Sequence, residues 1–186
     1  ADFLPVDGAD RSELIRCAAL TSLHDDTPEG KSTLDLARRM GDCSQEAPGS
    51  TFLDFTAQTR MSGVDLPDGR AVRKGAADAI EQYARAQGGS IPSDLHTIVE
   101  QVSSLGGTPL AVCENDKILG VIYLKDTVKP GMAERFERLR AIGIKTIMCT
   151  GDNPLTAATI AKEAGVDGFI AECKPEDKIR VIKQEQ

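Results

Sequence analysis

The sequence contains no tryptophan, only two histidines and no long apolar run. A helix that spans a membrane needs about 18 or more consecutive, mostly apolar residues, so we expect the chain as given to be soluble. Lysine and arginine total 22 against 29 aspartate and glutamate, which gives a net charge of −7. Because an acidic surface repels the phosphates of nucleic acids and of anionic lipids, we expect neither as a partner.

The five cysteines are scattered along the chain, without a C-x-x-C pair and without a histidine at ligand spacing. We therefore expect no metal site, and the odd number of unpaired thiols indicates a reducing compartment. His24 lies beside Asp25, Asp26 and Glu29, but a third ligand at a recognisable spacing is missing. We interpret this acidic cluster as a helix start that can also contact the ribose or amino groups of a ligand.

Up to about residue 124 the pattern predicts an antiparallel sheet with helices on one side. Residues 52–64 suit a strand, Asp68-Gly69 is typical of a hairpin turn, and residues 109–114 and 117–124 suit a second hairpin. Helices are predicted to follow N-caps at Asp10 and Thr27, and to occupy about 76–87 and the residues after 93.

The pattern changes after about residue 125. Helices are predicted to open at Pro130, Pro154 and Pro175, with strands over 144–149 and 169–171 between them. This alternation is typical of a parallel sheet. We therefore expect an α/β protein with two domains, residues 1–124 and 125–186, joined near 122–128.

The segment Thr150-Gly151-Asp152-Asn153-Pro154 lies where a strand of the parallel sheet ends and a helix begins. Many α/β proteins bind phosphate at this position, since the helix N-terminus attracts an anion. Gly151 permits a tight turn and Asn153 can cap the helix. From the local sequence alone, a phosphate site and a strand-to-helix turn with nothing bound are equally supported.

Two lysines and one aromatic residue also suggest binding chemistry. Lys178 falls in the first turn of the last helix, against the helix dipole, which is consistent with a role such as neutralising a phosphate, but an ordinary surface lysine is the commoner explanation of this position. Lys74 precedes Gly75 at the end of a strand and could reach a phosphate. Phe55 lies among polar residues, either as a core residue or as a platform on which a base stacks.

These segments follow one another in a recognisable order. They are SLHDDTPEGKS at 22–32, FTAQTRMSG at 55–63, Lys74-Gly75, Thr108-Pro109-Leu110, residues 126–131, TGDNP at 150–154 and PEDK at 175–178. Together they resemble the nucleotide-binding domain, followed by part of the haloacid-dehalogenase-like phosphorylation domain, of the B subunit of Kdp-type potassium-transporting P-type ATPases. The resemblance covers essentially the whole chain, and the first two segments are specific to the potassium subfamily.

The resemblance implies a role for each candidate residue. In the nucleotide-binding domain, Phe55 would stack on the adenine of ATP, and the pocket would be completed by Asp25, Glu29, Ser62, Lys74 and Gly75. In the phosphorylation domain, Thr150, Gly151 and Asp152 would meet the phosphate end of ATP, and Lys178 would steady the phosphoryl group.

Two motifs of that family are absent from the sequence. One is Asp-Lys-Thr-Gly-Thr, whose Asp accepts the phosphoryl group covalently, and the other is Gly-Asp-Gly-x-x-Asn-Asp, which holds Mg²⁺. We therefore expect a fragment that binds ATP weakly and does not hydrolyse it. A free-standing phosphatase of the haloacid dehalogenase type is excluded, because it would need the missing nucleophile.

For the intact pump, the resemblance implies use of ATP and Mg²⁺, an aspartyl-phosphate intermediate and potassium uptake. It also implies membrane subunits as partners and a position at the cytoplasmic face of the membrane. A pump for another cation, such as a heavy metal, is the alternative. Since the strand that carries the phosphorylated Asp would be central in the parallel sheet, we expect an open sheet edge that can pair with another chain.

Overall fold

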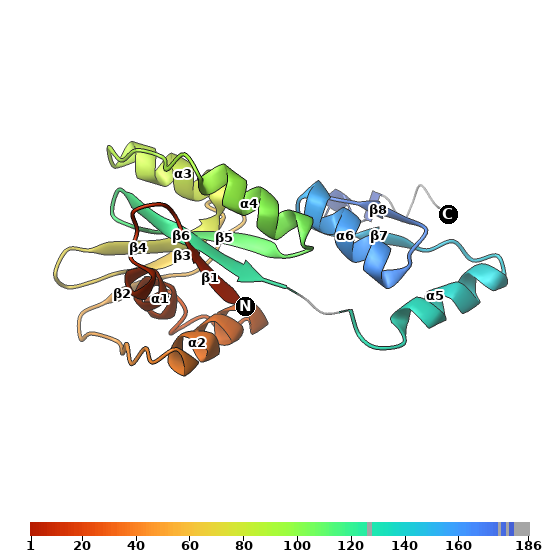
Figure 1. Ribbon diagram of the computed structural model, residues 1–186, viewed down its shortest axis with the longest axis horizontal. Coiled ribbons are helices and arrows are strands. Elements are labelled where there is room, and N and C mark those ends of the chain that lie inside the picture. Colours follow the sequence, from red (N-terminus) through yellow and green to blue (C-terminus); the bar gives the residue numbers. More distant parts are fainter. Residues whose placement is uncertain (126–127, 175, 178, 181–186) are drawn as a thin grey trace. The chain divides into compact units, whose positions relative to one another are not determined.

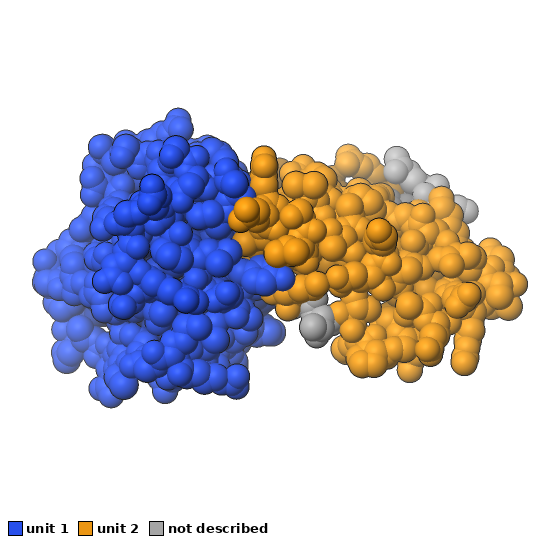
Figure 2. Space-filling view, in the orientation of Figure 1, with its two compact units in different colours: residues 1–99, 109–124 blue, residues 100–108, 125–186 orange. Residues whose placement is uncertain are grey.

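The computed structural model describes residues 1–125, 128–174, 176–177 and 179–180 of the 186-residue chain. The chain divides into two compact units, unit 1 with residues 1–99 and 109–124 and unit 2 with residues 100–108 and 125–186 (Figure 2). The domain boundary expected near residue 124 stays a prediction. Within the described residues, no helix is long and apolar enough to cross a membrane.

Unit 1 is built on a six-stranded sheet whose strand order is β1-β6-β5-β4-β3-β2 (Figure 1). The strands are β1 (Asp2–Pro5), β2 (Thr51–Leu53), β3 (Met61–Asp65), β4 (Ala71–Ala76), β5 (Thr108–Glu114) and β6 (Lys117–Leu124). The expected antiparallel sheet is confirmed, since β1 pairs antiparallel with β6, β2 with β3, β3 with β4 and β4 with β5. The short edge strand β1 was not predicted from the sequence.

The helices of this region are α1 (Arg11–Leu20), α2 (Pro28–Arg39), α3 (Ala77–Ala86) and α4 (Leu95–Ser104). In Figure 1, α1 and α2 cover one face of the sheet and α3 covers the other, so the expectation of helices on one side is wrong. The reason is visible in β5, where Ala111, Val112 and Cys113 are all buried. A strand that is buried at consecutive positions has both faces covered.

The helix starts follow the caps that the sequence predicts. The side chain of Asp10 accepts a hydrogen bond from the Ser12 amide at 2.8 Å, and the Thr27 hydroxyl accepts one from the Gly30 amide at 3.1 Å. Each satisfies an amide that has no partner within its helix. The segment of residues 21–27 between α1 and α2 is called here the α1–α2 turn. The Thr27 cap fixes its end, and the Thr21 and Ser22 hydroxyls, which donate to the carbonyls of Cys17 and Ala18, fix its start.

Residues 52–64 do not form the continuous strand that was expected, because a polar turn interrupts them. The Thr56 hydroxyl lies 2.8 Å from that of Thr59 and accepts a hydrogen bond from the Thr59 amide at 3.1 Å, while Arg60 adopts a positive φ of 52°. Threonine side chains that bond locally in this way compete with strand pairing. The chain consequently reverses, and β3 returns antiparallel to β2.

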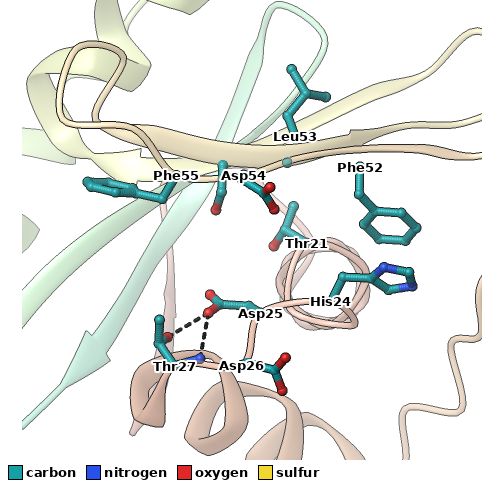
Figure 3. A pocket seen from close by; sticks show the side chains of 11 residues that line it. Thr21, His24, Asp25, Asp26, Thr27, Phe52, Leu53, Asp54 and Phe55 are labelled. Carbon is teal, nitrogen blue, oxygen red and sulfur yellow. Dashed lines mark hydrogen bonds between the residues drawn. The ribbon is translucent and has the colours of Figure 1, made fainter.

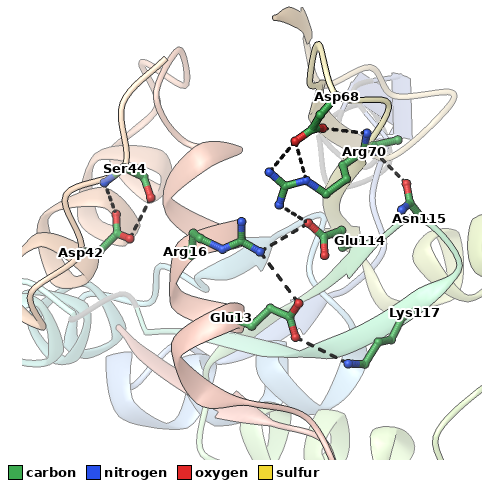
Figure 4. A network of polar contacts seen from close by, with 10 residues as sticks. Glu13, Arg16, Asp42, Ser44, Asp68, Arg70, Glu114, Asn115 and Lys117 are labelled. Atoms are coloured by element: carbon green, nitrogen blue, oxygen red, sulfur yellow. Dashed lines mark hydrogen bonds and ion pairs between the residues drawn. The ribbon is translucent and has the colours of Figure 1, made fainter. Parts of the chain in front are cut away.

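A network of ion pairs fastens α1 to the sheet (Figure 4). The Glu114 carboxylate at the end of β5 pairs with Arg16 of α1 at 3.5 Å and with Arg70, just before β4, at 3.0 Å. Glu13 extends the network to Lys117 of β6. Because Glu114 is largely buried, its two arginine partners provide the compensation that a buried carboxylate requires.

Unit 2 contains α5 (Met132–Ala141), β7 (Ile147–Cys149), α6 (Pro154–Ala164) and β8 (Gly168–Ile170). The strands β7 and β8 pair in parallel, which confirms the expected change of sheet type. Strand β7 is shorter than expected, since the Thr146 amide donates to the Asp167 carboxylate and not to a neighbouring strand. The helix expected from Pro175 begins at a residue that lies outside the described ones.

Candidate functional site

A cavity of about 550 Å³ opens between the α1–α2 turn and the strands β2 and β3 of unit 1 (Figure 3). Its volume falls within the range of about 300–1,000 Å³ that is common for small-molecule sites. The turn provides one wall, residues 52–55 provide the facing wall, and β3 contributes two further residues. The lining consists of Thr21, His24, Asp25, Asp26, Thr27, Phe52, Leu53, Asp54, Phe55, Ser62 and Gly63.

Phe55 lies just beyond the end of β2, lines the cavity and is 61% exposed. The core alternative considered for this residue is therefore wrong. The polar turn that starts at Thr56 ends β2 before Phe55 can enter the sheet. An exposed aromatic ring beside a cavity is suited to stacking against a flat ligand.

A second aromatic surface lies across the cavity from Phe55 (Figure 3). The rings of His24 and Phe52 stack with their centroids 3.8 Å apart and their planes 5° apart, and His24 Nε2 lies 2.8 Å from Glu46 Oε2. From the sequence, His24 was expected only as part of an acidic cluster, and no role was predicted for Phe52. No spacing rule could have joined these two residues, because they come from segments 28 positions apart in the chain.

Lys74 is buried, and its ammonium group is engaged within the protein. Nζ donates to Asp25 Oδ2 at 2.6 Å and to Ser22 Oγ at 2.8 Å, and Lys74 is 4% exposed. Lys74 is not one of the eleven residues that line the cavity. The phosphate contact suggested by its place in the sequence therefore competes with a buried ion pair.

The ion pair between Asp25 and Lys74 shifts the pKa values of both residues. Burial raises the pKa of Asp25, but hydrogen bonds from Lys74 and Thr27 outweigh this effect and leave the pKa below its ordinary value of 3.8. Burial lowers the pKa of Lys74, against the hydrogen bond and the charge of Asp25, which raise it. The Asp25 carboxylate is thus charged at neutral pH, and its charge opposes the effect of burial on Lys74.

Asp25 is also held from the side of α2. Its Oδ1 accepts hydrogen bonds from the Thr27 hydroxyl at 2.6 Å and from the Thr27 amide at 3.1 Å. A Cβ atom at Gly30 would lie 2.3 Å from Asp25 Cγ, so only glycine allows the first turn of α2 to approach this closely. These contacts leave Asp25 little freedom to move.

The other residues expected in the pocket have different positions. Ser62 is buried, lines the cavity and lies opposite Lys74 in the β3–β4 register. Gly75 lies opposite Met61, where a Cβ atom would come within 2.3 Å of the Arg60 carbonyl oxygen. Glu29 is exposed in the first turn of α2 and lies outside the cavity lining.

In unit 2, the segment 150–152 forms a compact loop between β7 and α6. The Thr150 hydroxyl donates to Asp152 Oδ2 at 2.8 Å and accepts from the Asp152 amide at 3.1 Å, and Asn153 caps α6 through the Thr156 amide. Gly151 has open space around it, since the nearest atom to an added Cβ is 3.7 Å away. Lys178, expected beside this loop, lies outside the described residues.

Comparison with known proteins gives the family of the chain. Residues 13–186 match the haloacid dehalogenase-like hydrolases. The chain belongs to this family. The potassium-transporting ATPase ATP-binding subunit of Clostridium acetobutylicum is 63% identical over 188 residues, which cover 100% of this chain and 27% of that protein. The potassium-transporting ATPase ATP-binding subunit 2 of Listeria innocua is 61% identical over 190 residues, covering 100% of this chain and 28% of that protein.

A solved structure supports the fold assignment. A zinc-transporting PIB-type ATPase in its E2.Pi state matches 100% of this chain and 28% of its own, with a TM-score of 0.61 and 27% sequence identity. The resemblance to potassium-transporting ATPase ATP-binding subunits is thus confirmed over the whole length of this haloacid dehalogenase-like chain. The chain spans a little over a quarter of the length of these curated relatives.

Proposed function

We propose that this chain is the ATP-binding part of a potassium-transporting P-type ATPase and that ATP binds in the cavity of unit 1. The observation that carries the proposal is the position of Phe55, which lines the cavity and is 61% exposed. The relatives that share 61–63% of its residues are named ATP-binding subunits, which supports a nucleotide as the ligand.

In this proposal, Phe55 stacks on the adenine, and Asp25 and Ser62 offer hydrogen-bonding groups to the same end of the nucleotide. The stack of His24 on Phe52 limits the width of the cavity on the other side. Lys74 and Gly75 support the cavity from β4. Glu29, which lies outside the lining, would meet only a part of the ligand that extends beyond the cavity.

The phosphate end of ATP would be met by Thr150, Gly151 and Asp152, with Lys178 steadying the phosphoryl group. The aspartate that accepts this group is not in the chain, since the sequence has no Asp-Lys-Thr-Gly-Thr motif. In the intact pump, we propose, transfer to that aspartate is coupled to potassium uptake.

Mg²⁺ would be needed by the intact pump. Within the residues that the structure describes, however, no group of three His, Cys, Asp or Glu side chains is arranged to hold a metal ion. We therefore propose no Mg²⁺ site among them.

A heavy-metal pump is the second candidate, because a zinc-transporting ATPase shares the fold. The identity of 63% with a potassium-transporting subunit, against 27% with the zinc-transporting protein, favours potassium.

We propose membrane subunits of the potassium-transport complex as partners and the cytoplasmic face of the membrane as the location. Pairing of a second copy with the β7–β8 sheet also stays a proposal, and sedimentation of the chain over a range of concentrations would test it.

A nucleotide titration followed by NMR tests the site. We expect ATP to bind with a Kd between about 100 μM and a few mM, since one stacked ring supplies little beyond the cost of association. Replacing Phe55 by Ala removes a stacking interaction of about 1–3 kcal/mol, so Kd should rise roughly 5-fold to 150-fold. Phe169→Ala, which removes an exposed phenylalanine of β8, is the matched control and should leave Kd unchanged.

Two outcomes would contradict the proposal. If the shifts cluster away from residues 21–27, 52–55 and 62–63, ATP does not occupy this cavity. If the chain alone hydrolyses ATP, the phosphoryl acceptor lies within it, and the proposal that the chain binds ATP without hydrolysing it is wrong.

A further inference from the structure

The side chain of Asn153 is bonded at both ends, so it does more than cap α6. Its Oδ1 accepts a hydrogen bond from the Thr156 amide at 2.9 Å, and its Nδ2 donates to Ser103 Oγ at 2.9 Å. We propose that Ser103 is a positioning residue, which acts through Asn153 to hold the loop of residues 150–152 in the shape that receives the phosphate end of ATP. This inference rests on the proposed function, that is, on contact between this loop and the phosphates.

The first argument concerns Ser103 itself. It lies in the last turn of α4, in the part of that helix that belongs to unit 2 together with the loop. Ser103 is 2% exposed, so water does not readily replace a partner that its hydroxyl loses. Because a backbone amide can only donate, the contact with Thr156 fixes which end of the Asn153 side chain faces Ser103. Asn153 Nδ2 is therefore the donor of this bond and Ser103 Oγ the acceptor.

The second argument concerns the segment of residues 103–108, called here the α4–β5 segment, which contacts the loop at a second point. The Thr108 hydroxyl donates to Asp152 Oδ1 at 3.5 Å, while the other carboxylate oxygen of Asp152 is bonded within the loop. The buried Thr156 hydroxyl of α6 donates to the Gly107 carbonyl at 2.8 Å. The α4–β5 segment thus holds the end of the loop and the first turn of α6 together.

The third argument concerns the packing on either side of the loop. Gly106 of the α4–β5 segment adopts a φ of 74°, and a Cβ atom there would lie 2.8 Å from Thr159 Cγ2 of α6. Glycine at this position therefore allows the segment to lie directly against α6. At Gly151, in contrast, an added Cβ atom would meet nothing closer than 3.7 Å. Since the loop has few close neighbours of its own, its shape depends on the hydrogen bonds at its end.

Binding of ATP and of adenosine by Ser103→Ala tests the inference, because adenosine carries no phosphate. We expect the substitution to weaken ATP about fivefold, since a loop that is competent a fifth of the time weakens its ligand by that factor. Adenosine should bind within about twofold of its affinity for the parent chain. Equal weakening of both ligands would show a general structural effect, and unchanged ATP binding would show no effect on the loop. Either result would overturn the inference.

Ser104→Ala is the matched control. Ser104 is the next residue of α4, is exposed, and donates its hydroxyl proton to the Gln101 carbonyl of the same helix at 2.8 Å. Its substitution removes the same oxygen atom from the same helix without touching Asn153. Both affinities should stay as in the parent chain, and a loss of ATP binding equal to that of Ser103→Ala would contradict the specific role of Ser103.

A double-mutant cycle shows whether Ser103 acts through Asn153. Asn153→Ser keeps a residue that caps helices as well as Asn does, but it removes the amide that donates to Ser103. It should therefore weaken ATP to a similar degree as Ser103→Ala. In the Asn153→Ser background, Ser103→Ala should change the Kd of ATP by less than about twofold. Additive effects of the two substitutions would mean that Ser103 does not act through Asn153.

Hydrogen exchange without any ligand examines the loop directly. The Asp152 amide donates to the Thr150 hydroxyl and the Thr156 amide to Asn153. Both amides should exchange faster in Ser103→Ala, whereas that of Gly165, which bonds to Ala161 at the far end of α6, should keep its protection. Unchanged exchange at Asp152 and Thr156 would overturn the inference even if ATP binds.

The amides of residues 150–152 in an NMR titration separate failure of this inference from failure of the proposed function. If ATP shifts none of them in the parent chain, the proposed phosphate contact is wrong and the inference falls with it. If ATP shifts them to the same extent in the parent chain and in Ser103→Ala, the phosphate contact stands and the inference alone is wrong.

Discussion

The imidazole of His24 lies face to face with the ring of Phe52, with 3.8 Å between the ring centroids. His24 comes from the α1–α2 turn and Phe52 from β2, so the stack joins the two walls of the cavity (Figure 3). Glu46 holds the far side of the imidazole through Nε2. The separation of the walls, and with it the space beside Phe55, therefore depends on a contact between two segments far apart in the chain.

We predict a measurable coupling between these two rings. Stacked aromatic pairs contribute about 0.5–1.5 kcal/mol beyond the area that they bury. The effects of His24→Ala and Phe52→Leu on the free energy of unfolding should therefore be non-additive by about this amount. Urea denaturation of the parent chain, both single variants and the double variant gives the coupling.

His96→Ala is the matched control, because His96 is exposed and touches only Glu81 among the contacts described. It should change the free energy of unfolding by less than about 0.5 kcal/mol. Strictly additive effects of the His24 and Phe52 substitutions would show that the stack does not hold the walls together.

The sequence was sufficient where structure is decided by neighbouring residues. The caps at Asp10, Thr27 and Asn153 depend on side chains that bond to amides two or three positions away, and all three are present. Turn chemistry likewise located the hairpin at Asp68-Gly69. The same local rules predicted that residues 150–152 form a loop between a strand and a helix.

Contacts between distant segments could not be derived in this way. The ion pair of Lys74 with Asp25 joins residues 49 positions apart, and the local sequence of Lys74 gives no sign of it. Phe55 was misplaced because β propensity favours a strand there, whereas the hydrogen bonds of Thr56 and Thr59 favour a turn. Tertiary context decided the first case, whereas the second was decided by competition between two local preferences.

We predict that Gly75 and Gly151, two glycines of the candidate sites, differ in how much the fold needs them. A Cβ atom at Gly75 would lie 2.3 Å from the Arg60 carbonyl oxygen and 2.7 Å from Met61 Cα. Since both atoms belong to the backbone of the paired segment, Gly75→Ala should force the strands apart and cost about 1–3 kcal/mol of unfolding free energy.

At Gly151 the added atom would meet nothing closer than 3.7 Å. Gly151→Ala should therefore cost less than about 1 kcal/mol. Thermal or urea denaturation of both variants measures the difference. Equal destabilisation by the two substitutions would contradict this steric account of Gly75.

The Asp167 carboxylate should make the stability of unit 2 depend on pH. Hydrogen bonds from the Thr146 amide, from Arg140 and from the Thr146 hydroxyl lower its pKa from 3.8 to about 2. These bonds measure 2.7, 2.5 and 2.9 Å, respectively, and tie the residue before β8 to α5 and to the approach to β7.

A carboxyl group whose pKa is lower in the folded state takes up its proton first in the unfolded state. The stability contributed by Asp167 should therefore be fully present above about pH 4 and be lost as the pH falls through about 2. Asp167→Asn should destabilise unit 2 at neutral pH and make its stability depend less on pH in this window.

Carboxyl-carbon NMR measures the pKa of Asp167 directly, and Arg140→Gln should raise this pKa toward 3.8. Arg138→Gln, two positions earlier in α5, is the control and should leave the pKa of Asp167 unchanged. A similar rise of this pKa in both variants would show that the general positive charge of α5, and not the contact with Arg140, lowers it.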